Sequence, residues 1–200
     1  ASIFYNVMKY DNIEKLVQVG IRDYCHQEKE IIKNSDGRMV VFYDRDNRRK
    51  MYEGSTWKQV CDDIINELPA KVYISIDIDG LDPKLCPNTG TPVPGGMEYE
   101  ELMYLLNRVK ESGKEIIGFD LCEVSPGEDE WDGNVGARVL YHLCGCVSGA
   151  CPECASAPAS APSPLHSAGG RRTRPATRGN TRIFPGAGTS GEHPPEPRCG

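Results

Sequence analysis

A strand that reads as buried ends in two carboxylates, and this combination restricts the folds open to the chain. Residues 72–76 are continuously apolar or small, as expected for a parallel strand that helices cover on both faces. Asp77 and Asp79 follow at alternate positions, so their side chains should project side by side, with Cα atoms roughly 7 Å apart. Two such charges in a poorly solvated place raise a carboxyl pKa unless a cation neutralises them. The pattern therefore indicates a metal site at a strand end.

Strand and helix signals alternate up to about residue 145, which predicts an α/β fold: a parallel sheet with helices on both faces. The long Pro- and Gly-rich connection from Gly80 to Gly96 is typical of a functional loop. Ligands of open parallel sheets bind beyond the carboxyl ends of the strands, so Asp77, Asp79 and Glu123 should share one crevice. The expected strands are 16–22, 38–43, 71–79 and 114–123, and the expected helices are 3–10, 27–33, 55–67, 98–112 and 133–145.

Residues 75–96 resemble the second metal-ligand signature of the ureohydrolase family, which includes arginase, agmatinase, guanidinobutyrase and formimidoylglutamase. Segments 16–23 and 118–124 resemble core strands of that family, and 131–138 resembles the start of its final helix. The resemblance covers about residues 1–145. It implies an arginase-like fold, a three-layer αβα arrangement with a parallel sheet.

The resemblance also implies a site that holds two manganese ions, Mn2+, and a guanidinium or amidine substrate. Asp77 and Asp79 are the implied metal ligands, Glu123 the implied acceptor of the guanidinium group, and Thr91 a hydroxyl-bearing partner beside it. A carboxylate suits this planar cation because it accepts two parallel charge-assisted hydrogen bonds. The implied reaction is hydrolysis of a C–N bond. Conversion of agmatine to putrescine and urea is the first choice, with arginase or formimidoylglutamase activity as alternatives, all within polyamine or arginine metabolism.

Four of the family's six metal ligands belong to two upstream motifs, of Gly-Gly-Asp-His and Asp-Ala-His-x-Asp type. Neither motif occurs in this sequence, which starts at Ala1 in a segment that the family reaches only after them. We therefore expect residues 1–146 to be the C-terminal part of a ureohydrolase catalytic domain, truncated at its N-terminus. No catalytic residue is assigned within the chain. The alternative from another functional class is that this chain is a fragment without catalytic activity.

The composition changes at Val147. Residues 147–200 contain 9 of the 15 prolines and only four large apolar side chains, too few to offset the entropy lost on ordering. Charge changes at the same place, because residues 1–146 carry a net charge of −9 and the remainder +3. We expect a low-complexity, disordered tail.

Cysteine spacing offers a different functional class. Cys144, Cys146, Cys151 and Cys154 form a Cys-x-Cys-x4-Cys-x2-Cys pattern, which could supply a tetrahedral zinc site. A zinc-dependent binding module is therefore the alternative to an enzyme, and accidental thiols are the simpler explanation of the pattern. The other cysteines lack framework spacing, which favours reduced thiols in a cytosolic protein.

Charge and hydropathy bound the partners. The acidic body argues against binding of nucleic acid or an anionic membrane, and no apolar run approaches transmembrane length or forms a signal peptide. A cytoplasmic protein with a small-molecule substrate is expected, and a homo-oligomer remains open. His26 and His142 match no ligand motif, whereas Asp82 is expected to stabilise a turn and Asp120 to support the site or the fold.

Overall fold

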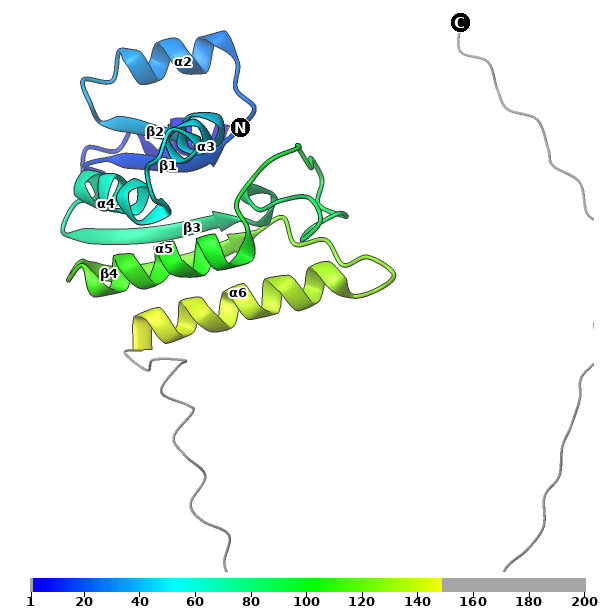
Figure 1. Ribbon diagram of the computed structural model, residues 1–200. Coiled ribbons are helices and arrows are strands. Elements are labelled where there is room, and N and C mark those ends of the chain that lie inside the picture. The colour runs from blue at the N-terminus through cyan, green and yellow to red at the C-terminus, as the bar shows by residue number, and fades with distance from the viewer. Residues whose placement is uncertain (1, 149–200) are drawn as a thin grey trace, which may run out of the picture. The chain divides into compact units, whose positions relative to one another are not determined.

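The computed structural model describes residues 2–148, in which helices and parallel strands alternate (Figure 1). The α/β class predicted from the sequence is confirmed. In chain order the elements are α1 (Ser2–Val7), β1 (Leu16–Ile21), α2 (His26–Lys33), β2 (Met39–Tyr43), α3 (Asp44–Tyr52), α4 (Trp57–Glu67), β3 (Lys71–Asp77), the 3-10 turn η1 (Ile78–Gly80), α5 (Tyr99–Glu111), β4 (Glu115–Cys122) and α6 (Trp131–Ser148).

The four strands form two parallel pairs. β1 pairs with β2, from Leu16 opposite Met39 onward, and β3 pairs with β4, from Lys71 opposite Glu115 to Asp77 opposite Cys122. The sequence predicts one open sheet, but within residues 2–148 the pairs are two separate two-stranded sheets. Side-chain packing joins them, because buried residues of α4 and α5 form a core cluster that contacts both β1 and β3.

Helix α6 packs against β4 through a strongly apolar face. Val135, Val139 and Leu143 are spaced four residues apart, so they lie on one side of the helix, and all three are buried. They share a core cluster with Ile76 of β3 and with α5 residues. This packing lays α5 and α6 over one face of the β3–β4 pair (Figure 1).

Helices cover the two strand pairs to different extents. On β1–β2, α1 and α2 lie over one face, and the α4 cluster packs against the other. On β3–β4, the face opposite α5 and α6 carries Tyr73 and Ser75, both of which are exposed. The three-layer arrangement is therefore present at β1–β2, and within residues 2–148 one face of β3–β4 has no helix over it.

Two predictions about individual elements were wrong. Residues 44–52 were not assigned to a helix, but they form α3, whose sequence has almost no apolar periodicity and which is held by polar contacts of Asp44 and Arg48. The strand predicted to reach residue 79 ends at Asp77, because the chain turns there to bury Ile78 completely.

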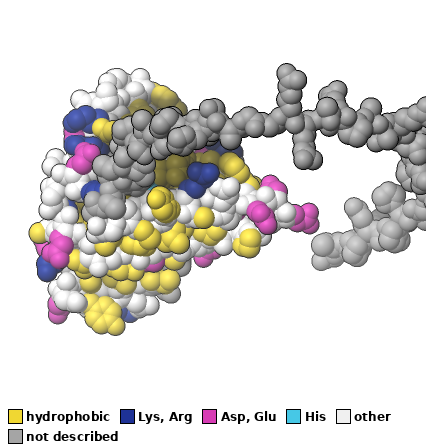
Figure 2. Space-filling model, turned by 90° about the horizontal axis from the view of Figure 1, so that it is seen from below, with side chains coloured by type: hydrophobic (Ala, Val, Ile, Leu, Met, Phe, Trp, Pro, Cys, Tyr) yellow, Lys and Arg dark blue, Asp and Glu magenta, His cyan; other side chains and the backbone are white. Residues whose placement is uncertain are grey.

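The outer side of α6 carries exposed apolar side chains. Figure 2 views the molecule from this side, and yellow side chains are spread over it. The large apolar residues of α6 that are exposed are Trp131, Leu140, Tyr141 and Val147. Among residues 2–148, none of the helices has the length and apolar character that a membrane span requires. The predicted tail beyond Ser148, with Cys151 and Cys154, lies outside the described residues.

Candidate functional site

The candidate site lies where β3 and β4 end. Asp77 is the last residue of β3 and lies opposite Cys122, the last residue of β4, and Glu123 follows directly. Because the two strands are parallel neighbours, Asp77 and Glu123 lie at the same edge of the sheet. The structure therefore brings together the acidic residues that the sequence placed at two successive strand ends.

Asp79 reaches this edge by a different route from the one predicted. It lies in the 3-10 turn rather than on the strand, so the alternation of strand side chains does not place it beside Asp77. Instead, the Asp79 backbone N–H donates a hydrogen bond of 3.1 Å to Asp77 Oδ1. The Asp77 carboxylate caps the turn that carries Asp79, and the two acidic residues are coupled through the backbone.

Negative charge is concentrated at Asp77. Its pKa is raised mainly because neighbouring atoms partly desolvate the carboxyl group. The hydrogen bond from the Asp79 backbone opposes this increase of the pKa, and the charges of Asp79 and Glu123 add to it. Asp77 as a residue nevertheless remains exposed at the rim, so a ligand from solution can reach it. A cation bound here would relieve the repulsion among these carboxylates.

The long loop folds back onto both acidic ends. Thr91 Oγ1 donates a hydrogen bond of 3.3 Å to Asp79 Oδ2. Gly90 lies against Glu123, since a Cβ atom added to Gly90 would be 3.4 Å from Glu123 Oε2. The loop thus lies between a candidate metal ligand and the candidate guanidinium acceptor, and the four residues predicted from the sequence, Asp77, Asp79, Thr91 and Glu123, line one rim.

Glu123 has an unusual backbone conformation. Its φ is +61°, in the left-handed region that residues other than glycine seldom adopt. The buried Thr89 donates from Oγ1 to the Glu123 carbonyl oxygen at 3.0 Å, which helps to hold this conformation. Strained backbone of this kind is concentrated at functional sites, and here it turns the chain sharply between β4 and the segment that follows.

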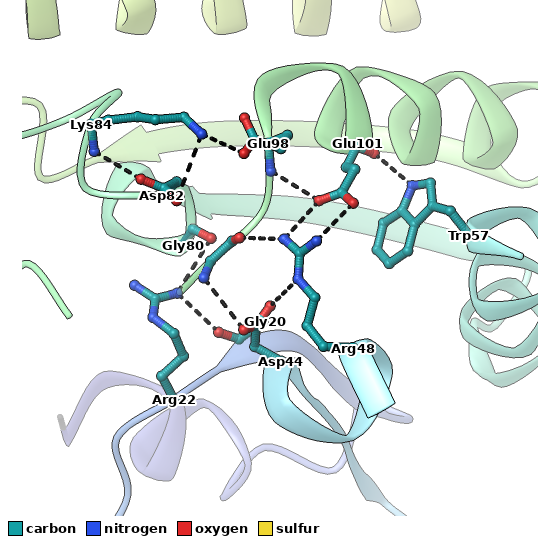
Figure 3. A network of polar contacts seen from close by, with 11 residues as sticks. Gly20, Arg22, Asp44, Arg48, Trp57, Gly80, Asp82, Lys84, Glu98 and Glu101 are labelled. Carbon is teal, nitrogen blue, oxygen red and sulfur yellow. Dashed lines mark hydrogen bonds and ion pairs between the residues drawn. The ribbon is translucent and has the colours of Figure 1, made fainter. Parts of the chain in front are cut away.

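Residues of the β1–β2 side fix both ends of the loop (Figure 3). At the start, Gly80 O accepts hydrogen bonds from Met97 N at 3.0 Å and from Arg22 Nη1 at 3.4 Å. At the end, Gly96 O accepts from Arg48 Nη2 at 2.6 Å, and Gly96 N donates to Asp44 Oδ2 at 3.4 Å. The loop is therefore closed at its base by contacts that cross from one strand pair to the other.

Arg48 also forms a bidentate ion pair in this network. Its Nη1 and Nη2 donate to the two carboxylate oxygens of Glu101 at 3.0 and 2.9 Å, the two-pronged geometry that arginine and carboxylate favour. Both side chains are mostly buried. Trp57 Nε1 adds a hydrogen bond of 3.0 Å to the Glu101 carbonyl oxygen (Figure 3), so α3, α4 and α5 meet at this point.

Arg22 is a residue of this region to which the sequence analysis gave no role. Its guanidinium donates to the carbonyl oxygens of Asp79, Gly80 and Gly20. It therefore holds the backbone of η1, the turn that carries Asp79. The only sequence signal was its place in segment 16–23, which resembles a family core strand but does not reveal contacts with residues almost 60 positions away.

The other polar residues considered in the sequence analysis lie outside this rim or stabilise a turn or the sheet. Asp82 accepts a hydrogen bond of 3.0 Å from Lys84 N, which is the turn role predicted for it. Asp120 accepts from Ser75 Oγ at 2.8 Å, on the exposed face of β3–β4. His26 is exposed, and His142 is half buried on α6.

The cysteines of the possible zinc site do not face one another where the structure describes them. Cys146 is buried in the core cluster of α6, whereas Cys144 is exposed. Burial raises the pKa of the Cys146 thiol, which disfavours the thiolate form that zinc binds. Within residues 2–148 there is no group of three or more His, Cys, Asp or Glu side chains placed to hold a metal ion.

The donor chemistry of the rim agrees in type with a manganese site. Asp77 and Asp79 offer carboxylate oxygens, the hard ligands that manganese accepts, and the crowding of their charges gives a cation a reason to bind. Two carboxylates are nevertheless only part of a ligand set. Asp77 and Asp79 are thus suited to provide some, but not all, of the ligands of a metal centre.

A parallel α/β fold with acidic residues at adjacent strand ends, beside a long loop, places the chain in the class of α/β proteins that bind ligands beyond the carboxyl ends of their strands. Comparison with known proteins identifies the member of that class. The model of the arginase family matches residues 1–146, which is more than half of the chain. The chain belongs to the arginase family.

Curated relatives carry several names within the family. The chain is 36% identical over 130 residues to N(1)-aminopropylagmatine ureohydrolase of Thermus thermophilus, a match that covers 65% of this chain and 41% of that protein. It is 33% identical over 111 residues to mitochondrial arginase-2 of Mus musculus, covering 56% of this chain and 30% of that protein. The chain therefore spans less than half the length of these relatives.

Solved structures give the same family with the same partial coverage. The arginase of Bacillus subtilis aligns with a TM-score of 0.57 at 28% identity, covering 66% of this chain and 45% of that one. A hypothetical agmatinase of Burkholderia thailandensis aligns with a TM-score of 0.58 at 25% identity, covering 77% and 45%. The similarity thus extends from the sequence to the arrangement of strands and helices.

Proposed function

We propose that this chain forms part of a binuclear manganese hydrolase that cleaves a C–N bond of a guanidinium group and, in the agmatinase-like case, converts agmatine to putrescine and urea. The observation that carries the proposal is the position of the 80–96 loop. Its residue Thr91 donates a hydrogen bond to Asp79, and Gly90 lies beside Glu123, so a candidate metal ligand and a candidate substrate acceptor line one rim. Membership of the arginase family supports this chemistry.

In this proposal Asp77 and Asp79 contribute two of the metal ligands. The hydrogen bond from Asp79 N to Asp77 Oδ1 fixes one carboxylate relative to the backbone of the other. Arg22 donates to the Asp79 carbonyl oxygen, which limits how the turn can move. Manganese, when bound, supplies Lewis-acid activation of water and neutralises the crowded carboxylates.

Glu123 and Thr91 hold the cationic head of the substrate. The Glu123 carboxylate is exposed and offers two oxygens to the parallel N–H groups of a guanidinium. Thr91 contacts Asp79 through its hydroxyl hydrogen, which leaves its oxygen lone pairs available to a substrate N–H. Together they would orient the guanidinium carbon toward the metal ligands, and such orientation lowers the barrier by restricting the reactants in advance.

Agmatine is the first choice of substrate, with arginine and formimidoylglutamate as alternatives. The head-group residues would serve any guanidinium or amidine, so the identity of the substrate depends on contacts with its other end. The names of the relatives support a decarboxylated substrate, since one acts on N(1)-aminopropylagmatine and a structural relative is a hypothetical agmatinase. Arginases among the relatives keep arginine as the second candidate.

The chain alone is expected to be inactive. Its two carboxylates are part of a ligand set, and residues 2–148 hold no group of three metal-binding side chains. An inactive fragment therefore stays the alternative from another functional class. A zinc-dependent module has no comparable support, because Cys146 packs into the core.

The test joins this chain to the part of a relative that it does not match. Two chimeras are made, one with the unmatched part of the Thermus thermophilus enzyme and one with that of mouse arginase-2, and each is loaded with manganese. Urea release is measured with agmatine, N(1)-aminopropylagmatine and arginine. The proposal expects both chimeras to prefer agmatine over arginine, because a shared preference comes from the shared chain. Two inactive but folded, metal-loaded chimeras would contradict it.

A further inference from the structure

Asp132 is a buried carboxylate for which the proposed reaction has no use. It lies in the first turn of α6 and has no exposed surface. Both of its oxygens accept hydrogen bonds from one residue of the 80–96 loop. Oδ2 accepts from the Asn88 backbone N–H at 2.9 Å, and Oδ1 accepts from Asn88 Nδ2 at 3.0 Å.

Burial of a carboxylate is unfavourable unless hydrogen bonds replace the water that it loses. At Asp132 the two bonds from Asn88 are charge-assisted, and the positive end of the α6 dipole adds a favourable field. The carboxylate is not needed to begin the helix, because Asp129 Oδ1 already accepts a hydrogen bond of 3.2 Å from Trp131 N. The hydrogen bonds of Asp132 therefore act on the loop rather than on the start of the helix.

Asn88 stands immediately before the residues that touch the candidate site. Thr89 donates to the Glu123 carbonyl oxygen, Gly90 lies against the Glu123 carboxylate, and Thr91 donates to Asp79. A displacement of Asn88 would move all three, because the chain allows little freedom over one to three residues.

The segment that precedes α6 packs tightly against Asn88. A Cβ atom added to Gly127 would lie 2.2 Å from Asn88 Nδ2, so a larger residue there would have to push the Asn88 side chain away from Asp132. Trp131 Nε1 adds a second tie, a hydrogen bond of 3.0 Å to the carbonyl oxygen of Lys84. The start of α6 and the segment before it thus form a seat for the loop.

We propose that Asp132 and Asn88 are a positioning pair that sets Thr91 against Asp79, and Thr89 and Gly90 against Glu123. The proposal rests on the proposed function for the meaning of those contacts, and on the hydrogen bonds alone for the pair itself. Asp132 acts through Asn88 and does not touch the substrate. The two residues lie 44 positions apart in the sequence, so their hydrogen bonds join the loop to the start of α6.

The test reverses the pair in the 200-residue chain. Asn88→Asp places two carboxylates face to face, where they repel each other. The double variant Asn88→Asp with Asp132→Asn restores both bonds, because the new amide oxygen accepts the backbone N–H and the new amide nitrogen donates to the new carboxylate. Asn88→Ala removes only the side-chain bond, and Asp129→Asn is the matched charge control at the same helix end.

Two measurements read the result. Hydrogen exchange is followed for the amides of residues 86–91, with residues 72–77 of β3 as the internal reference. In methyl-labelled chain, Mn2+ added alone reports the distance of the Thr91 methyl group from the metal through paramagnetic broadening. If Mn2+ broadens signals near Asp77 and Asp79 in the parent chain but leaves the Thr91 methyl signal sharp, the contact between Thr91 and Asp79 is contradicted.

The positioning pair predicts a specific pattern. Asn88→Asp should speed exchange at residues 86–91 by at least about tenfold relative to β3 and weaken the broadening of Thr91, and the double variant should return both to within about threefold. Asn88→Ala should give a smaller change in the same direction, and Asp129→Asn none. A double variant no better than Asn88→Asp would overturn the proposal. If excess Mn2+ broadens no signal near Asp77, the result counts against Asp77 and Asp79 as metal ligands in the proposed function, while the exchange data still decide the pair.

Discussion

The Thr91 hydroxyl donates a hydrogen bond of 3.3 Å to the Asp79 carboxylate, and this contact joins the 80–96 loop to the end of β3. One oxygen of Asp79 is thereby oriented by the loop, while its backbone is held by Asp77 and Arg22. A carboxylate fixed from both sides is preorganised to bind a metal ion, because little freedom remains to be lost on binding.

Asp79→Asn should remove metal and activity together in a chimera that restores the rest of the ligand set. A neutral amide is a poor ligand for a hard cation, although it keeps the size of the side chain and can still accept from Thr91. Metal content after dialysis and urea release measure the effect. Asp82→Asn is the matched control, since Asp82 is a nearby carboxylate that caps a turn. An Asp79→Asn enzyme with its full manganese content would exclude Asp79 as a ligand.

In the same chimera, Glu123→Gln should separate substrate binding from metal binding. The variant should keep its manganese, while kcat/KM falls by roughly 2 to 4 kcal/mol of transition-state stabilisation, comparable to the loss of a desolvated charge pair. Steady-state kinetics and metal analysis of the same preparation check both halves. Loss of the metal, or a kcat/KM within about threefold of the parent, less than 1 kcal/mol, would remove the guanidinium-binding role from Glu123.

The sequence predicts most of the elements because their apolar periodicity is strong. Helix α4 was expected at 55–67 and is found at Trp57–Glu67, where Val60, Cys61, Ile64 and Ile65 are buried. Helix α3 escaped prediction because it is polar on nearly every side. Its position depends on Arg48 and Asp44 reaching the loop end at Gly96, and such tertiary contacts leave no periodic signal.

The sequence predicts that these acidic strand ends meet, but it does not predict their detailed geometry. Asp77 and Glu123 come together because parallel neighbours end at one edge, which is a rule of sheets. The 3-10 turn at Asp79 and the positive φ of Glu123 depend on the burial of Ile78 and on the bond from Thr89. The pairing of Asn88 with Asp132 joins residues far apart in the chain, so spacing could not reveal it.

The 200-residue chain alone should release no measurable urea from agmatine or arginine. Two ligands cannot hold a binuclear centre, so metal analysis after dialysis should find well under one manganese per chain. The matched positive control is the manganese-loaded chimera under identical assay conditions. Robust turnover of either substrate by the purified chain would show that its own residues complete the site.

Gly96→Ala should destabilise the fold more than Gly54→Ala. Both glycines have similar φ values, +102° and +105°, but a Cβ atom at Gly96 would lie 2.5 Å from the Leu81 carbonyl oxygen, whereas nothing lies within 4 Å at Gly54. Gly54→Ala therefore reports backbone strain alone, about 1 to 3 kcal/mol. Gly96→Ala adds a backbone clash at the base of the loop. Urea unfolding measures both, and equal losses of stability would show that the loop base yields without cost.

Cys61 should make the fold less stable in alkaline solution. Burial, and then the charge of Asp62, raise the pKa of its thiol to about 12, whereas an unfolded thiol ionises near 8.5. The unfolded chain therefore loses this proton first as the pH rises, and its release favours unfolding. The stabilising contribution is complete below pH ~8.5 and declines above it by up to about 1.4 kcal/mol per pH unit.

Urea unfolding of the parent and of Cys61→Ala between pH 8 and 10.5 checks this linkage. The variant lacks the thiol, so its free energy of unfolding should fall less steeply with pH, and the two curves should converge as the pH rises. The buried Cys86, with a thiol pKa raised to about 11 mainly by burial, is present in both proteins and cancels in the comparison. Parallel curves would mean that Cys61 ionises in the folded chain as readily as in the unfolded one, which its complete burial makes unfavourable.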